Sequence, residues 1–115
     1  MIKRKYDIIE LSNGEKELTV SFVGENLELL ALLFNGELEN FSDWIRINIE
    51  DVLNRNVQNR HISGNICELN INYEKTRIYN ILTDDDLYCE IDTKELYNLI
   101  NEWVEKNSSL KMRDY

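Results

Sequence analysis

The acidic run at 84–86 comes nearest to a metal site in residue type and spacing. Counted from Asp84, carboxylates fall at positions 1, 3, 7, 9 and 12 of a twelve-residue window, as in a calcium-binding loop. Such a loop needs glycine at position 6 for its sharp turn, and Cys89 stands there. Leu87 and Ile91 also alternate as strand residues do. The sequence therefore predicts a solvated turn, with no metal ligand and no cofactor.

Nucleophilic chemistry has little support. The histidine His61 lies near Ser63 and Asp51 in the sequence, but nearness along the chain does not make a triad. Cys67 and Cys89 sit in alternating apolar runs, which predicts reduced thiols buried as small apolar side chains. The four glycines are isolated, so no phosphate-binding loop is present. We predict no catalytic residue. A pocket that holds two acids or a metal would restore the hypothesis of an enzymatic function.

The charge of the chain points to a class of partner. The 115 residues carry a net charge of -9, which disfavours nucleic acid and anionic membranes as partners. The basic N-terminus is not followed by an apolar segment, so we expect no secretory signal and a cytoplasmic protein. Residues 6–53 hold eleven acids and two bases, and residues 84–105 hold eight and one. These blocks serve either general solubility or the docking of a basic protein.

Aromatic residues coincide with the acidic blocks. Trp44, Tyr88 and Tyr79 fall on the polar side of predicted strands, where tryptophan and tyrosine are typical interface anchors. Alternatively, the rings fill a second small core under a loop. The predicted partner-binding residues are Trp44, Asp84, Asp85, Asp86, Tyr88 and Glu90.

Two Asn-Gly pairs, at 13–14 and 35–36, predict two β-hairpins, because both residue types tolerate the positive φ of a tight turn. Alternating or continuous apolar residues predict the strands themselves. Residues 50–57 fit a short helix only ambiguously, and residues 60–65 are predicted to be a loop. The predicted strands are 6–11, 17–23, 27–34, 37–41, 44–49, 66–73, 77–83 and 87–91.

The C-terminal segment predicts an amphipathic helix. Asp92 and Glu95 have the spacing of a capping box. Apolar residues then recur at helical spacing: Leu96, Leu99, Ile100, Trp103 and Val104. A helix this short is marginal alone, so it must lie on the sheet. We expect one α+β domain over 1–115, in which a helix covers one face of an antiparallel sheet of about six or seven strands, with a frayed tail at 108–115.

A small acidic chain with a hairpin-built sheet, closed by the segment Glu-Ile-Asp-Thr-Lys-Glu-Leu-Tyr-Asn-Leu-Ile-Asn-Glu-Trp, resembles the immunity proteins of bacterial polymorphic-toxin and contact-dependent growth inhibition systems. That group shares no catalytic residues that could be assigned here. The resemblance implies a cytosolic, non-enzymatic protein that binds a cognate toxin domain, often a nuclease, and blocks its active site. The alternative is a homo-oligomeric scaffold or a small ligand-binding domain without a toxin partner.

Overall fold

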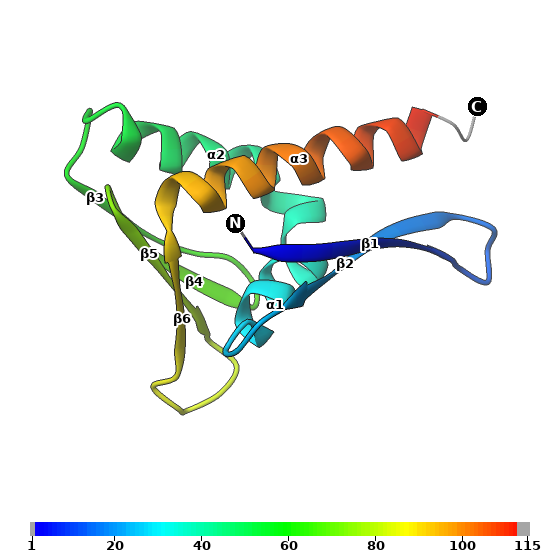
Figure 1. Cartoon of the computed structure of the whole chain (residues 1–115), viewed down its shortest axis with the longest axis horizontal. Helices are drawn as coiled ribbons and strands as arrows, with labels where there is room; N and C mark the ends of the chain where they lie inside the picture. The colour runs from blue at the N-terminus through cyan, green and yellow to red at the C-terminus, as the bar shows by residue number, and fades with distance from the viewer. Residues whose placement is uncertain (1, 113–115) are drawn as a thin grey trace.

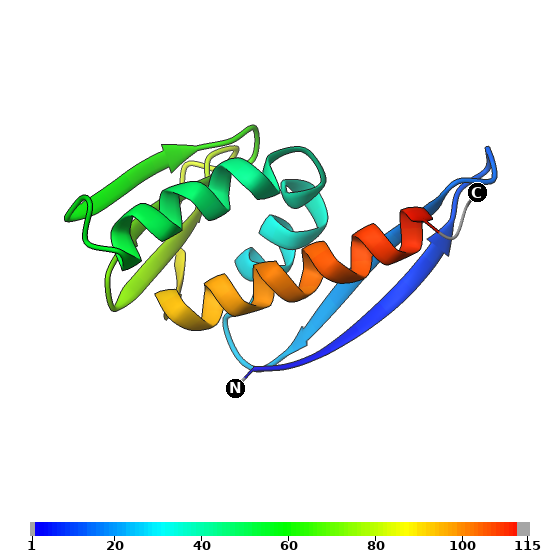
Figure 2. The same ribbon diagram turned by 90° about the horizontal axis from the view of Figure 1, so that it is seen from above.

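The computed structural model describes residues 2–112 and arranges them as two antiparallel sheets and three helices (Figure 1). The helices α2 and α3 lie side by side; α2 covers the four-stranded sheet, and α3 extends from that sheet to the β1–β2 hairpin (Figures 1 and 2). In chain order the elements are β1 (Lys3–Glu10), β2 (Lys16–Val23), α1 (Glu28–Gly36), α2 (Leu38–Leu53), β3 (Asn59–Ser63), β4 (Cys67–Asn72), β5 (Lys75–Asn80), β6 (Tyr88–Asp92) and α3 (Thr93–Met112).

The first predicted hairpin is confirmed. β1 and β2 pair antiparallel along their whole length, from Lys3 opposite Val23 to Glu10 opposite Lys16. Gly14 has φ +86° in the connecting turn, a conformation that glycine adopts without strain. The hairpin forms a sheet of its own beside the four-stranded sheet, so the single sheet of six or seven strands that we predicted is wrong.

The second predicted hairpin is wrong, because Asn35 and Gly36 end helix α1 instead of forming a turn between strands. The apolar run at 27–34 reads equally well as a buried helix. Leu30, Leu33 and Phe34 are spaced along one helical face and are all buried. A continuous apolar run cannot by itself distinguish a central strand from a covered helix.

The predicted strand at 44–49 is also helical and belongs to α2. Ile45 and Ile49 lie one helical turn apart and are buried, whereas Ile47 is 57% exposed. A strand would have put all three isoleucines on one face. The helix ends at Leu53, so the ambiguous segment 50–57 is helical over its first four residues.

The other four strands form a sheet in the order β3-β4-β5-β6, with every pair antiparallel. The predicted strands at 66–73, 77–83 and 87–91 correspond to β4, β5 and β6. β3 lies where we predicted a loop; its single inward apolar residue, Ile62, gives too weak a pattern to reveal a strand. The helices cover one face of this sheet, which carries the buried residues Ile62, Cys67, Leu69, Ile71, Ile78, Cys89 and Ile91.

The C-terminal helix is confirmed but longer than expected. Leu96, Leu99, Ile100 and Trp103 are buried, and Val104 is half-buried. The helix continues to Met112 through part of the segment expected to fray, and residues 113–115 lie outside the described range.

The last turns of α3 are ordered by the first hairpin. Leu110 is only 6% exposed and lines a groove together with Leu18 of β2. Near its start, α3 is joined to β1 by Glu95, whose carboxylate accepts the Ile2 backbone N–H at 2.7 Å. Within residues 2–112, none of the helices has the length and apolar character needed to cross a bilayer.

Candidate partner-binding surface

The face of the four-stranded sheet that the helices leave open carries a cluster of aromatic and charged side chains. Tyr79 and Tyr88 are directly opposite each other on β5 and β6, with ring centroids 5.7 Å apart. The guanidinium of Arg77 lies 4.3 Å from the centre of the Tyr88 ring, and its Nε donates to Glu90 at 3.0 Å. The Tyr88 ring is therefore held in place before any partner arrives.

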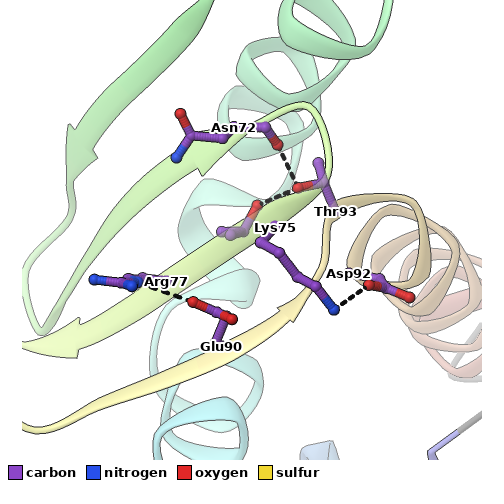
Figure 3. A network of polar contacts seen from close by, with 7 residues as sticks. Asn72, Lys75, Arg77, Glu90, Asp92 and Thr93 are labelled. Atoms are coloured by element: carbon purple, nitrogen blue, oxygen red, sulfur yellow. Dashed lines mark hydrogen bonds and ion pairs between the residues drawn. The ribbon is translucent and has the colours of Figure 1, made fainter.

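The β5–β6 ladder is fixed at its other end by polar contacts (Figure 3). Lys75 Nζ donates to Asp92 at 2.6 Å, and this carboxylate raises the pKa of the lysine. The Thr93 hydroxyl lies 2.8 Å from that of Thr76 and donates to the Asn72 carbonyl oxygen. These bonds join β5 and β6 to the start of α3, at the end of the ladder that lies away from the loop 81–87.

That loop, residues 81–87, presents apolar and acidic side chains together. Leu82 is 71% exposed and Leu87 is 70% exposed, on either side of the acidic run 84–86. Leu87 was predicted to begin the strand 87–91, but β6 begins only at the next residue. The loop is shaped by its own polar side chains: Leu82 N–H donates to Asn80 Oδ1 at 2.9 Å, and Leu87 N–H donates to Asp85 Oδ1 at 3.3 Å. The acidic run 84–86 lies in the connection between β5 and β6 as predicted, but the turn itself falls at residues 81 and 82.

Two grooves of about 390 and 460 Å³ run beside the loop, where the segment between β2 and α1 approaches β6. They share Asn26 and Tyr88, and among the described residues that line them there is no lysine, arginine or histidine. Acidic residues from two distant parts of the sequence meet along them. We call this surface the acidic edge; its members are Glu25, Glu28, Asp84, Asp85, Asp86, Tyr88 and Glu90.

Glu25 and Glu28 were not among the predicted binding residues, although both belong to the first acidic block. Glu28 was assigned to the strand predicted over 27–34, but it is the first residue of α1, and Glu25 lies just before that segment. Asn26 has φ +60°, which turns the chain sharply into the helix and brings Glu25 beside β6. All carboxylates of the acidic edge are exposed.

Trp44 does not join the other predicted binding residues. It is on α2, which packs on the covered face of the sheet against β3 and β4, whereas Tyr88 is on the open face of β6. The Trp44 indole is 43% exposed and packs edge-on against Phe41, with ring centroids 6.0 Å apart. With the exposed Ile47 it forms a separate apolar area on α2.

The groups that could have carried other chemistry are dispersed or shielded. Within residues 2–112, no group of three or more His, Cys, Asp and Glu side chains is placed to hold a metal ion. The carboxylate of Glu68 pairs with His61, 2.6 Å from Nε2. Cys67 and Cys89 are free and buried as predicted, and burial raises the pKa of Cys67 to about 12. Neither thiol is available as a nucleophile at neutral pH.

Comparison with known proteins gives a relative over almost the whole chain. No protein-family model matches the sequence, and no solved structure matches it significantly. A protein of Bacillus cereus named "Immunity protein" is 32% identical over 112 residues, which cover 96% of this chain and 93% of the relative. At that identity and coverage, the chain belongs to the family of this immunity protein.

Proposed function

We propose that the chain is a non-enzymatic bacterial immunity protein that binds and neutralises a cognate toxin domain through the acidic edge. Its relationship to a named immunity protein supports the general role. The observation that carries the choice of surface is the meeting of two segments, residues 25–28 and 84–90, in grooves that Tyr88 shares with Glu25, Glu28, Asp85 and Glu90. Asp84 and Asp86 are exposed in the adjoining loop.

The composition of the acidic edge suits a basic protein partner. Clustered charges of one sign speed the encounter with a surface of the opposite sign, an effect that salt weakens. Exposed apolar side chains such as Leu82 and Leu87 add area that a partner can bury. Tyr88, ordered by Arg77, would lose little side-chain freedom on binding. The charges would thus set the association rate, and the ring and leucines would slow dissociation.

A nuclease is the toxin class that this surface fits best. Its active-site cleft must attract phosphates and is therefore positively charged. A row of carboxylates can occupy such a cleft in place of the nucleic acid backbone. On this proposal, binding at the acidic edge and blockage of the active site are one event.

Binding at Trp44 stays a prediction from the sequence. A partner seated on the acidic edge would have to extend around the sheet to reach α2. We therefore place Trp44 outside the main contact and treat it as a second site that mutation can test separately.

The experiment pairs the chain with the toxin domain encoded beside its gene. The wild type should form a 1:1 complex, inhibit the toxin and protect cells that express it. Reversing Asp84, Asp85 and Asp86 to lysine should slow association at low salt by about tenfold or more and weaken protection. The matched control reverses three exposed acids elsewhere, Glu15, Glu74 and Glu105, with the same change in net charge. Equal association rates for the two triple variants would refute the proposed surface.

A further inference from the structure

β1 is a free sheet edge. It pairs with β2 along all eight residues, and within residues 2–112 no other strand pairs with it. In Figure 2 it runs along the outer rim of the molecule, with β2 between it and the helices. The backbone N–H and C=O groups on its outer side therefore have no strand partner, and such an edge is a template for a further strand.

The other edge of the same hairpin is closed by the chain itself. The Asn35 side chain pairs with the backbone of Val20 as a strand would: Oδ1 accepts the Val20 N–H, and Nδ2 donates to the Val20 carbonyl oxygen, both at 3.0 Å. α1 also packs on β2, where Phe34 meets Phe22 edge-on with ring centroids 5.2 Å apart. Asn35 and α1 thus obstruct the β2 side of the hairpin, whereas the β1 side lies open to another strand.

The charges along β1 are complementary to a reversed copy of the same strand. Lys3, Arg4 and Lys5 lie in its first half, and Asp7 and Glu10 lie in its second half. A parallel copy would place like charges together. An antiparallel copy places the basic half against the acidic half, and opposite charges directly across from each other stabilise a strand pair.

One register satisfies both the charges and the side-chain faces. With Tyr6 opposite Tyr6 of the second copy, Lys5 lies opposite Asp7, and the pair occurs twice because of the two-fold symmetry. A shift by two residues would put Asp7 against Asp7, which is repulsive. Lys5 and Asp7 are available for this pairing: their side chains are 77% and 53% exposed, and within one chain Lys5 Nζ is a distant 3.9 Å from Asp7 Oδ1.

We propose that β1 binds β1 of a second copy, so that two hairpins form one continuous antiparallel sheet in the order β2-β1-β1-β2 around a two-fold axis at Tyr6. The exposed side chains of Ile8 and Ile9 add apolar area beside the new strand pair. This dimer goes beyond the proposed toxin binding and requires no toxin, so each proposal can fail while the other holds.

The test is the mass of the purified full chain as a function of concentration, by sedimentation equilibrium and light scattering. We expect a dimer of twice the 13.7 kDa chain mass that dissociates on dilution. Asp7→Lys and Lys5→Asp should each weaken dimerisation by about tenfold. The double variant Lys5→Asp/Asp7→Lys should restore it, because the swapped charges again face each other. Glu17→Lys on β2 is the control, since it matches the charge change of Asp7→Lys away from the edge.

The register is tested by mixing Lys5→Cys chains with Asp7→Cys chains under mild oxidation. A disulfide should form between unlike chains in preference to like chains, and the native thiols are buried and should not interfere. Circular dichroism must show that each variant is folded. A monomer at every concentration, a double variant that stays dissociated, or a Glu17→Lys variant as weak as Asp7→Lys would overturn the proposal. A monomer whose toxin binding is weakened by Asp7→Lys would show that the toxin occupies the edge instead.

Discussion

Gly64 lies against the buried carboxylate of Glu37, so close that a Cβ atom at position 64 would stand 1.7 Å from Oε2. Glu37 connects α1 to α2 and is 1% exposed. Its Oε1 accepts the backbone N–H groups of Asn65 and Ile66 at 3.1 Å each, and Oε2 accepts that of Cys67 at 3.4 Å. One side chain thus fixes the β3–β4 turn to the junction between the helices.

Gly64→Ala should destabilise the protein. The added methyl group collides with Glu37. It forces the turn away from the carboxylate that accepts the backbone N–H groups of the turn. We expect a loss of about 2–3 kcal/mol in the free energy of unfolding, measured by urea denaturation. Gly14→Ala is the control without a collision, because an added Cβ there meets nothing within 4 Å and the cost comes only from strain at φ +86°. If Gly64→Ala costs no more than Gly14→Ala, the turn is not held by Glu37 in this way.

Glu102 should contribute stability that acid removes. Its hydrogen bond and ion pair with Arg4 lower the pKa of the Glu102 carboxyl below its ordinary value in the folded state. A lowered folded pKa gives stability that is present above the unfolded pKa and is lost as pH falls through the folded pKa. Glu102→Gln should therefore cost about 1 kcal/mol at pH 7, and the difference from the wild type should shrink below about pH 4. A difference that is constant from pH 7 to pH 3 would contradict this.

The two thiols should be unreactive in the folded chain. Burial raises the pKa of both, to about 12 for Cys67, so at pH 8 they are protonated as well as shielded. Titration with a thiol reagent should label neither cysteine in native buffer and both in denaturant. Rapid labelling of either in native buffer would mean that its strand opens easily.

Leu110→Ala should loosen the end of α3 and the hairpin together, because this residue packs where the helix meets β2. We expect a loss of about 2–3 kcal/mol in stability and faster amide exchange over residues 105–111. The neighbouring exposed position Ser109→Ala is the control. Equal effects of the two changes would show that the last turns of the helix carry no packing.

Tyr88→Ala should speed dissociation of the toxin complex by about tenfold or more, because it removes the ordered ring at the centre of the acidic edge. Trp44→Ala reports on the second site. An unchanged dissociation rate in Trp44→Ala confines the contact to the acidic edge. A comparable increase in that rate means that the partner also covers α2. A loss at Trp44 with none at Tyr88 would place the toxin on the wrong face for the proposed function.

The sequence predictions were correct where adjacent residues alone determine the structure, and wrong where a contact with a distant segment determines it. The Asn-Gly pair at 13–14 was read correctly because polar residues flank it and the Asn13 side chain bonds within the turn, where its Oδ1 accepts the Glu15 N–H at 2.9 Å. At 35–36 the same dipeptide ends a helix, and the Asn35 side chain bonds to the backbone of β2. This tertiary contact cannot be predicted from the local sequence. At 44–49 the isoleucines fit both periods, and only the exposure of Ile47 distinguishes helix from strand.

The candidate surface was predictable in part for the same reason. The acidic run at 84–86 and the outward Tyr88 and Glu90 follow from local alternation, and the structure confirms their exposure. Glu25 and Glu28 reach the same surface only because the chain folds back after β2. Trp44 was grouped with them on the assumption that its segment was a strand.

Nuclear magnetic resonance would test the central claim most directly, by titrating the isotope-labelled chain with the toxin domain encoded beside its gene. We predict that the amide signals of residues 25–28 and 79–90 shift or broaden most, and that raising the salt concentration reduces the effect. Changes confined to α2 around Trp44, to β1, or to no residue at all would contradict binding at the acidic edge.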